Sequence, residues 1–568
     1  MKKIGILLIL LILLGFVMPV GTWYGPPTNL GPGTDNTHCL ALEDFDKDGY
    51  IDIAVGNFGG QNVVYFGDGD GTFDSRQVNI GGGTDLTRAI LACDVNDDTW
   101  VDIIVGNGSG TQNYIYVNDG DGTFDITSYS FGTGTDWTYA LAAANINGDT
   151  FTDLAVGNIG QQNYVYLSDG VDNPYDTPAN EIPFGLPGPQ YGNTWDLVLA
   201  DMNDDTFLDL VEANHQTKNH VYLGNGTGSF GAAYGLGQHD FGLSIEFTHS
   251  LAVIDLNGDT ILDVVEGNDQ GQNRARLGIG TGAMGTSYAF GPVDDRTQAV
   301  ALADVNGDTH LDVAVANGRS NPEQNKIYLG NGDGTFGDSW NVGSGDASWD
   351  IKFEHFNSDA LIDIVVANEG QNYVYLNMET TINNIATLFD TYTFFVAGDN
   401  AYCTDVLGSA KIAFGLARGG TSGNPEGRTD LILTTTEHDT GNLIPVGGPG
   451  INPIADEFDG YFGITWNYDP GAIPPVFQIF AEGYTLTLNL NDYPGEDICI
   501  VYIAEHNNRN VMLVWGYGWR GTYAGSAYIG DPSKWALHTG AHMLMIRWID
   551  GNGDGLVQMG EIAVEQSV

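Results

Sequence analysis

The sequence is poor in basic residues, and this scarcity excludes several kinds of partner. Only 19 residues are Lys or Arg, against 73 that are Asp or Glu, which leaves a formal net charge of −54 at pH 7. A surface of this charge repels phosphate backbones, so no nucleic acid partner is expected. It also argues against polybasic binding to anionic lipid. Clustered carboxylates attract divalent cations instead, and Ca²⁺ prefers such oxygen ligands.

Cysteine and long apolar segments are also scarce. The four cysteines are too few for a disulfide scaffold, and Cys403 and Cys499 either pair outside the cell or stay free. Residues 1–21 begin with two lysines near the N-terminus and continue as an apolar run, which is typical of a secretory signal peptide; a retained anchor is the alternative. No other segment is long and apolar enough to span a membrane. We therefore expect a secreted, extracellular or cell-surface protein that meets a membrane only if this segment is uncleaved.

Glycine and one acidic motif, by contrast, are abundant. The 80 glycines indicate many tight turns. The motif first ends at Asp52, and its later copies end at Asp102, Asp153, Asp209, Asp263, Asp312 and Asp363. A period of about 50 residues, with short alternating strands and glycine turns, is typical of propeller blades. We predict a mainly β chain with a seven-bladed β-propeller over residues 22–378.

The seventh copy lacks its last strand. After Leu376 no Gly-Thr-Phe segment follows, whereas residues 21–35 match the segment that begins at Gly71 in the first copy. The N-terminal segment is therefore expected to close blade seven as its outer strand. Closure removes sheet edges that would otherwise be open to aggregation.

Each copy of the motif is a candidate calcium loop. Oxygen-bearing side chains stand at loop positions 1, 3, 5 and 9, where they can converge on one hard cation; without metal, the same residues would form an Asx-rich turn. The predicted ligands are Asp44, Asp46, Asp48, Asp52, Asp94, Asn96, Asp98, Asp102, Asn145, Asn147, Asp149, Asp153, Asp201, Asn203, Asp205, Asp209, Asp255, Asn257, Asp259, Asp263, Asp304, Asn306, Asp308, Asp312, Asn357, Asp359 and Asp363.

Two loops depart from this pattern. The third has only two carboxylates, and the seventh begins with His355, a poor Ca²⁺ ligand, so these two should bind most weakly. Position 6 is glycine only in the first loop. Threonine or alanine in the other loops is expected to change the loop geometry and lower the affinity.

These repeats resemble the FG-GAP (VCBS) repeats of the integrin α-subunit propeller and of related bacterial and archaeal surface proteins. The resemblance covers about residues 21–378. It implies an extracellular adhesion or glycan-binding module, although a minority of the family are lyases or other enzymes. A fold shared by so many functions does not name the ligand.

Alignment of the repeats on the acidic loop reveals further rings. Seven residues before each loop stands a hydroxyl, for which a structural role is expected: Thr37, Thr87, Thr138, Thr194, Thr248, Thr297 and Ser348. The next residue varies and forms a candidate ligand-binding face at one mouth of the channel: His38, Arg88, Tyr139, Trp195, His249, Gln298 and Trp349. The alternative is that these seven only line the channel. Asparagines that flank the second turn, such as Asn57 and Asn62, are predicted to bond the local backbone.

An enzymatic function would need a catalytic pair. Glu212 and Glu266 replace a valine found at the same strand position in the other repeats, so they are candidates for a carboxylate pair in polysaccharide chemistry. The alternative is that both are structural acids. No Gly-x-Ser-x-Gly or His-Glu-x-x-His motif is present in the sequence.

The repeats give way to a linker at 379–393 and a smaller α/β or α+β domain at 394–568. Its segments around Gly398-Asp399-Asn400 and Gly447-Gly448-Pro449 resemble the C-terminal region of archaeal surface-layer-like proteins, which implies a cell-envelope role. Residues 550–561 fit an EF-hand loop position by position, with Asp550, Asn552, Asp554 and Glu561 as predicted Ca²⁺ ligands.

The sequence thus favours a non-enzymatic, calcium-binding propeller that acts in adhesion or in recognition of an extracellular glycan or surface protein. Ca²⁺ at several structural sites is the expected cofactor. The alternatives are a polysaccharide-processing enzyme on the same scaffold and a structural surface-layer subunit that assembles with copies of itself.

Overall fold

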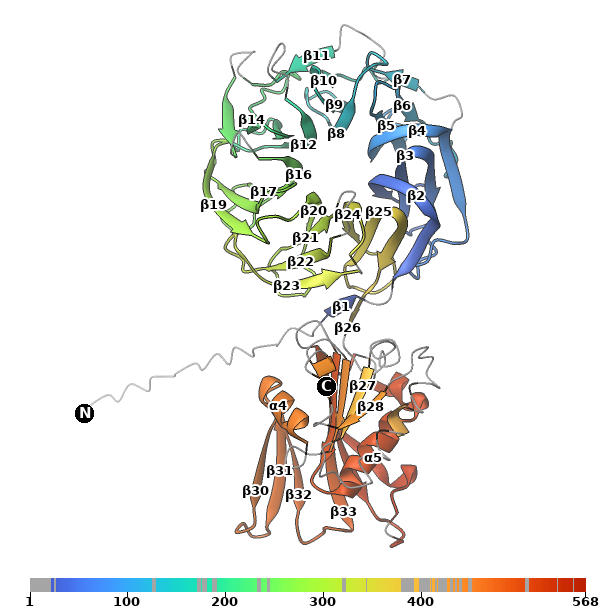
Figure 1. Cartoon of the computed structure of the whole chain (residues 1–568), viewed down its shortest axis with the longest axis vertical. Coiled ribbons are helices and arrows are strands. Elements are labelled where there is room, and N and C mark those ends of the chain that lie inside the picture. The colour runs from blue at the N-terminus through green and yellow to red at the C-terminus, as the bar shows by residue number, and fades with distance from the viewer. Residues whose placement is uncertain are drawn as a thin grey trace, which may run out of the picture.

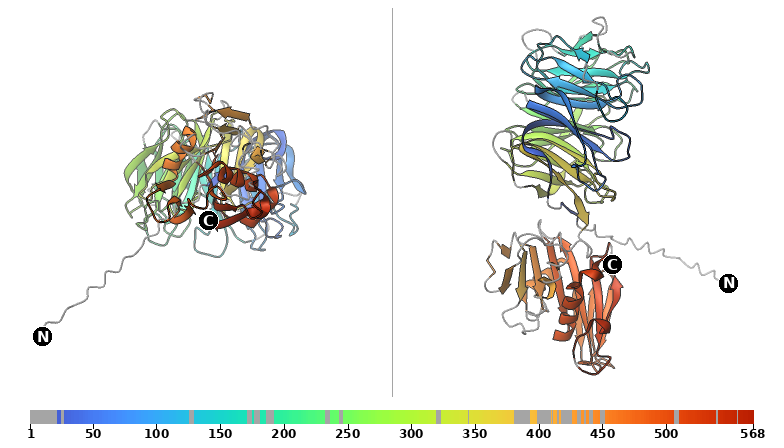
Figure 2. Two further views of the ribbon diagram at one scale, coloured as in Figure 1. Left: turned by 90° about the horizontal axis from the view of Figure 1, so that it is seen from below. Right: turned by 90° about the vertical axis from the view of Figure 1, so that its right-hand side faces the viewer.

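The computed structural model of the chain describes residues 22–24, 27–124, 129–170, 175, 181–185, 192–231, 236–242, 246–318, 323–343, 345–379, 393–397, 409, 411–413, 416, 426–429, 433–434, 437–438, 442–447, 452–505, 510–538, 540–554 and 556–568. It shows a ring of β-sheets around a central opening and a second β-rich body beside it (Figure 1). Figure 2 shows both bodies from two further directions. The predicted signal segment, the linker and Cys403 lie outside the described residues. None of the described helices has the length and apolar character needed to cross a membrane.

The ring is built from short antiparallel strands. They are β2 (Thr28–Glu43), β3 (Asp52–Tyr65), β4 (Gln77–Cys93), β5 (Asp102–Asn107), β6 (Asn113–Tyr116), β7 (Tyr129–Phe131), β8 (Thr138–Ala144), β9 (Asp153–Asn158), β10 (Asn163–Tyr166), β11 (Glu181–Phe184), β12 (Thr194–Ala200), β13 (Asp209–Asn214), β14 (Asn219–Tyr222), β15 (Gln238–Phe241), β16 (Thr248–Ile254), β17 (Asp263–Asn268), β18 (Asn273–Gly278), β19 (Met284–Phe290), β20 (Thr297–Ala303), β21 (Asp312–Asn317), β22 (Asn325–Gly330), β23 (Phe336–Val342), β24 (Ser348–Glu354) and β25 (Asp363–Tyr375).

Four sheets each contain four consecutive strands: β8 to β11, β12 to β15, β16 to β19 and β20 to β23. The remaining strands form one eight-stranded sheet in the order β24-β25-β2-β3-β4-β5-β6-β7. Within it, the long strands change partners along their length. For example, β2 pairs with β25 through residues 28–30 and with β3 through residues 37–43.

The two ends of the repeat region meet in this sheet. Thr28 lies opposite Val374, and Leu30 lies opposite Asn372. Farther out, β1 (Thr22–Tyr24) pairs with β26 (Asn377–Glu379), and the Tyr24 hydroxyl donates to the Ile362 carbonyl at 3.1 Å. Segments more than 330 residues apart in the sequence thus form one sheet, which is the pairing that the truncated seventh repeat predicts.

Apolar clusters fill the space between successive sheets. One joins Ala54 and Val64 of the first repeat to Ile103, Val105 and Tyr116 of the second, and all five side chains are buried. Successive apolar residues of one strand point to opposite faces of its sheet, as Ala54 and Val55 do in two different clusters, so each sheet presents apolar side chains to both neighbours.

A belt of hydrogen bonds runs around the ring beside this apolar core. The hydroxyl at the start of an inner strand donates to an asparagine of the same repeat, as in Thr138 to Asn158 at 2.9 Å. A second asparagine of the preceding repeat donates to the same hydroxyl, as in Asn113 to Thr138 at 2.9 Å. The link from Asn372 to Thr37, at 2.8 Å, closes the circuit. These asparagines also bond the local backbone, since the Asn57 side chain donates to the Gln61 carbonyl.

The belt predicts a large difference between two similar substitutions. Thr138→Val preserves shape but leaves the Asn113 amide and the Asn158 carbonyl without their buried partner, so we expect a loss of about 2–4 kcal/mol in the free energy of unfolding. Thr138→Ser should be nearly neutral, because Ser348 holds the same position in the seventh repeat. Guanidinium unfolding of both variants and of the native protein measures these changes in the free energy of unfolding. Equal stability of the two would contradict the role given to the hydroxyl.

The second body is a mixed sheet with helices and a small extra sheet. Its strands are β27 (Thr393–Ala397), β28 (Glu426–Thr429), β29 (Asn442–Val446), β30 (Thr465–Asp469), β31 (Val476–Ala481), β32 (Tyr484–Asn489), β33 (Glu496–Glu505), β34 (Asn510–Gly516), β35 (Met543–Ile549) and β36 (Ile562–Ser567). Its helices are α4 (Pro453–Tyr461), α5 (Trp519–Ile529) and the 3-10 turns η4 (Pro532–His538) and η5 (Met559–Glu561).

The main sheet has the order β28-β27-β29-β34-β33-β35-β36, with parallel pairs on the β27 side and antiparallel pairs from β33 onward. The small sheet has the order β30-β31-β32. Two buried clusters form the core of this body, and Cys499 lies fully buried in one of them. A mixed sheet that carries helices is the arrangement expected of an α/β or α+β domain.

Candidate functional site: acidic loops and channel mouth

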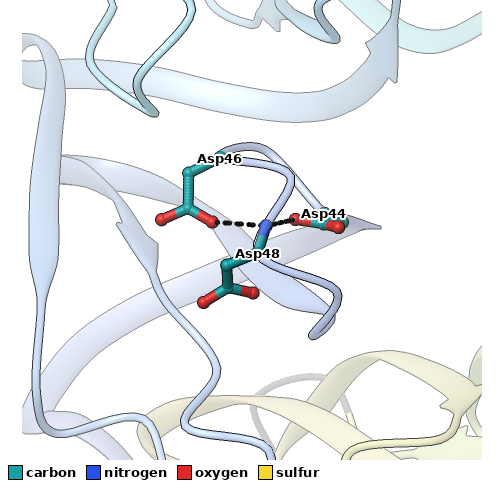
Figure 3. A group of neighbouring side chains, drawn as sticks. All are labelled: Asp44, Asp46 and Asp48. Carbon is teal, nitrogen blue, oxygen red and sulfur yellow. Dashed lines mark hydrogen bonds between the residues drawn. The ribbon is translucent and has the colours of Figure 1, made fainter.

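The first acidic loop brings three carboxylates together. Asp44, Asp46 and Asp48 each place one oxygen within 4.8 Å of the others, and both Asp44 and Asp46 accept from the Asp48 backbone N–H (Figure 3). Arg76 pairs with Asp46 at 2.7 Å. Within the described residues, no other set of three acidic, histidine or cysteine side chains meets this distance. The later loops carry an asparagine amide in place of at least one carboxylate.

The sixth loop position has a left-handed backbone in five of the loops. Its φ is 96° at Gly49, and it is 77°, 73°, 72° and 71° at Thr99, Thr206, Thr260 and Thr309. In each of these loops the position-6 N–H donates to the side chain at position 1. The expectation that a residue other than glycine changes the loop geometry is therefore wrong for these four threonines. Instead, a β-branched residue is held in a conformation that costs on the order of 1–3 kcal/mol, and such strain gathers at functional sites.

The third and seventh loops are built differently. Neither Thr150 nor Ala360 has a positive φ. In the third loop the Asn145 amide donates to the Asp149 carbonyl at 2.7 Å, and in the seventh the His355 ring bonds the Leu361 carbonyl at 2.7 Å. These are the two loops for which the sequence predicts the weakest binding.

The aspartate at position 9 serves the fold as well as the loop. All seven of these side chains are fully buried. In the first loop, one oxygen of Asp52 accepts from the Phe45 N–H at 2.8 Å and the other from the Gly67 N–H at 2.9 Å. Burial raises the pKa of Asp52 and of Asp102 to about 7, while the backbone hydrogen bonds oppose this shift. A bound cation would favour the charged form of the same groups.

The loop near the C-terminus folds back on itself. Glu561 accepts from the Gly551 N–H at 3.1 Å and from the Trp548 indole at 3.3 Å, and Asp550 accepts from the Gly553 N–H at 2.7 Å. Asn552 accepts from the Asp554 N–H at 2.8 Å. The last residue of the predicted EF-hand loop thus returns to its start, as ligation at position 12 requires.

The seven variable residues after the hydroxyl ring all line one cavity of about 500 Å³. We call these seven residues, from His38 to Trp349, the collar. Five of them follow the first residue of an inner strand, and His38 and Arg88 hold the same position within the longer strands β2 and β4. In every repeat an acidic loop follows the last residue of that strand. Because an inner strand of seven residues is about 20 Å long, the collar and the acidic loops lie at opposite ends of the channel.

Contacts between collar residues hold their rings in place. Trp195 stacks on His249 with centroids 3.6 Å apart and an angle of 5°, and Tyr139 meets Trp195 edge-on at 5.0 Å. His38 stacks on Trp349 at 3.8 Å. The collar is therefore a preformed aromatic rim, of the kind that lines ligand pockets.

Beneath the collar the channel carries three charged side chains that sequence reasoning missed. Asp196 and Asp350 lie two residues after the hydroxyl, where the other repeats have alanine, cysteine or serine, and Lys352 lies four residues after it, where the others have apolar side chains. Lys352 pairs with Asp350 at 3.6 Å. The signal was available in the alignment of repeats, because each of these residues departs from its column.

Glu212 and Glu266 lie between repeats, away from the collar. Glu212 is 2% exposed and accepts from Asn163, Thr194, Asn214 and the Tyr222 hydroxyl at 2.8–3.0 Å. It borders a hollow of about 20 Å³, which cannot admit a sugar.

Glu266 is 0% exposed and accepts from Asn219 at 2.7 Å and from Arg276 at 2.6 Å. Burial raises the pKa of Glu266 to about 7, and the Arg276 guanidinium opposes the shift. The structure assigns both glutamates to the packing between repeats, where each occupies its own hydrogen-bond network, rather than to one catalytic pair.

Comparison with known families identifies the repeats. The family described as "FG-GAP-like repeat" matches residues 44–105, 94–156, 201–266, 255–315 and 304–353. These matches begin at the first residue of the first, second, fourth, fifth and sixth acidic loops, and no match begins at the third or seventh. The loops that start a match are the five that share the left-handed sixth position.

Two solved structures show a distant likeness to the chain. A chain from the crystal structure of BBS1N in complex with ARL6DN is 13% identical, with a TM-score of 0.43, over 63% of this chain and 98% of that one. A lectin of Agrocybe aegerita that recognises non-reducing terminal N-acetylglucosamine is 17% identical, with a TM-score of 0.38, over 59% of this chain and 86% of that one. Neither likeness informs the function at these scores. No curated protein matches the chain.

Proposed function

Because its repeats match this family, the chain is an FG-GAP repeat protein, and we propose that it acts outside the cell as a calcium-bound propeller whose channel mouth binds glycans. The proposal has three parts: the number of blades, the metal in the acidic loops, and the ligand at the collar. The observation that carries it is the convergence of seven variable, largely aromatic and polar side chains on one cavity of about 500 Å³.

The number of blades in the proposal is seven. Four are the separate four-stranded sheets. The other three share the eight-stranded sheet, in which β2, β3, β4 and β25 each change partner and so serve two positions. The uninterrupted hydrogen-bond belt, with one hydroxyl for each repeat, supports the same count.

Calcium in the acidic loops is supported by their chemistry. Aspartate and asparagine oxygens are ligands that Ca²⁺ prefers, and several carboxylates this close together repel one another without a cation. The strained threonines add a second argument, because a metal that fixes the loop offsets the cost of their backbone. The loops that share this geometry, namely the first, second, fourth, fifth and sixth, are the proposed tight sites.

A glycan at the collar follows from what the collar offers. Aromatic rings pack against the apolar faces of sugars, while polar groups such as Gln298 and His249 can hydrogen-bond their hydroxyls. The residues vary between repeats, whereas a purely structural ring would repeat like the hydroxyl belt does. Variation on a uniform scaffold is the pattern expected of a recognition surface.

The test is a glycan-array screen of the full chain in Ca²⁺, followed by affinity measurements on the best ligand. We expect Trp349→Ala to weaken binding by about tenfold or more, since loss of one stacking ring removes about 1–3 kcal/mol. Trp466→Ala is the matched control, because Trp466 is half exposed on β30 of the second body. Binding that is equally strong in Trp349→Ala and in the native protein would contradict a role for the collar.

A further inference from the structure

The channel holds two of the few cations of the chain. Only 19 of 568 residues are Lys or Arg, yet Arg88 stands in the collar and Lys352 beneath it, and both line the same cavity. Burial raises the pKa of the Cys39 thiol on the channel wall, and both cations oppose this shift, so they lie near the same part of the channel. Asp196 and Asp350 line the same cavity, so the two cations stand there beside two carboxylates.

The aspartates of the channel are fixed in place by backbone hydrogen bonds. Asp196 accepts from the backbone N–H groups of Leu197 and Leu251, both at 2.8 Å. Asp350 accepts from Ile351 at 2.8 Å and from Leu40 at 2.9 Å. In both cases one of the two bonds reaches the inner strand of another repeat, so these carboxylates hold the inner strands together. They keep their charge and balance the two cations in number, while their positions are set by the backbone.

Lys352 retains capacity for a ligand. Its ion pair with Asp350 is long at 3.6 Å, and its side chain is 43% exposed on the cavity wall. An ammonium group offers three donors, so at least two remain for a partner that enters the channel. Nearby Asp350 and Asp196 favour the charged form and raise the pKa of Lys352, which keeps the ammonium charged at neutral pH.

Arg88 is held more firmly than Lys352. Its guanidinium bonds the His38 ring at 2.5 Å and lies 4.0 Å from the Phe58 ring centroid and 5.1 Å from that of Tyr139. A positioned arginine among aromatic rings makes a rim that is both apolar and cationic. The ammonium of Lys352, deeper in the channel, is then the group best placed to meet a carboxylate.

We propose that the channel mouth binds acidic saccharides, with the carboxylate of a uronic acid paired to Lys352 and the sugar ring packed against the collar. The cavity of about 500 Å³ lies within the usual range for ligand pockets. A peptide carboxyl terminus offers the same charge, but the flat aromatic rim and the polar groups of Gln298, His249 and Ser250 match a hydroxylated ring better. This inference rests on the proposed binding of glycans at the collar and specifies their class.

The test compares ligands that differ only in their carboxyl groups. Short oligogalacturonates and short alginate oligosaccharides, below the length at which Ca²⁺ cross-links such chains, and the same oligosaccharides with every carboxyl group reduced to an alcohol, are titrated calorimetrically into the full chain in Ca²⁺. We expect the uronates to bind at least about tenfold more tightly than the neutral sugars, because a charge-assisted hydrogen bond contributes about 1.5–3 kcal/mol. Raising the NaCl concentration should weaken only the uronates.

Variants assign the effect to Lys352. Lys352→Met should remove the preference for uronates and leave the affinity for neutral sugars unchanged, whereas Lys352→Arg should retain the preference. Lys218→Met is the matched control, since Lys218 is a half-exposed surface lysine paired with Asp240. Melting of each variant in Ca²⁺ checks folding. If Lys352→Met does not fold, the affinities of Lys352→Arg and the salt dependence of binding by the native chain still test whether a charge in the channel sets the preference for uronates.

The outcomes separate the two proposals. Equal affinity for uronates and neutral sugars, with both lost in Trp349→Ala, would overturn the acidic-saccharide inference and keep the collar as a glycan site. A preference for uronates that survives in Lys352→Met would also overturn the inference, as would tighter binding of N-acetylated amino acids than of uronates. Absence of binding to every sugar would overturn both proposals.

Discussion

Removal of residues 22–30 is expected to destabilise the whole ring rather than one edge of it. These residues supply the outer strand opposite residues 372–374 and the pairing of β1 with β26. Leu30 is 1% exposed in a cluster with residues of both the first and the last repeat, so its loss opens the core between them. Loss of one buried leucine alone costs about 2–5 kcal/mol, and an open ring also exposes strand edges.

A pair of point variants makes this test sharper. Leu30→Asp places a charge in the buried cluster, whereas Asn29→Asp makes a similar change at the neighbouring, exposed residue of the same strand. Calorimetric unfolding should show a large loss of stability for Leu30→Asp and the deletion, and almost none for Asn29→Asp. Unchanged unfolding of the deletion variant would contradict closure of the ring by the N-terminal strand.

Chelation of Ca²⁺ is expected to lower the free energy of unfolding at least as much as removal of residues 22–30. A site that is filled at a hundredfold excess over its dissociation constant stabilises the fold by about 2.7 kcal/mol, and five similar sites together contribute on the order of 10 kcal/mol. EDTA should therefore lower the melting temperature strongly, and an excess of Ca²⁺, but not of Mg²⁺, should restore it. Mg²⁺ demands tighter octahedral geometry than these flexible oxygen loops offer.

A pair of variants separates Ca²⁺ binding in one loop from the screening of the chain's overall negative charge. Asp308→Asn alters the fifth position of the sixth loop, and Asp333→Asn makes the same change in an exposed turn of the same repeat, where Asp333 accepts only from Thr335. The first variant should lower the stability gained from Ca²⁺ by about the contribution of one site, and the second should not. Equal effects would mean that Ca²⁺ acts by screening charge rather than by binding in the loops.

Several features could be predicted from the sequence because they repeat. The acidic loop, the hydroxyl and the variable residue after it recur at fixed distances from one another, so register alone brings each set to one end of the channel. The missing strand of the seventh repeat pointed to the N-terminus for the same reason. Periodicity carries this information without any knowledge of side-chain contacts.

Features that depend on a neighbouring repeat could not be predicted in this way. The bond from Asn113 to Thr138 joins two sheets, and nothing within a single repeat specifies its partner. Glu212 shows the same difficulty: its departure from valine was evident, but only the structure shows that it accepts from Asn163 of the preceding repeat. The channel charges depart from their columns in the alignment of repeats, but their electrostatic influence on one another, as of Lys352 on Asp196, joins different repeats and shows only in the structure.

The number of Ca²⁺ ions bound per chain tests the central claim most directly. The protein would be stripped with chelator, equilibrated with Ca²⁺ and dialysed, and its bound metal would be counted by elemental analysis and by native mass spectrometry. We predict at least five ions per chain, one for each loop with a left-handed sixth position, and one fewer in Asp308→Asn. Fewer than one ion per chain, or the same count in Asp308→Asn as in the native protein, would contradict the account.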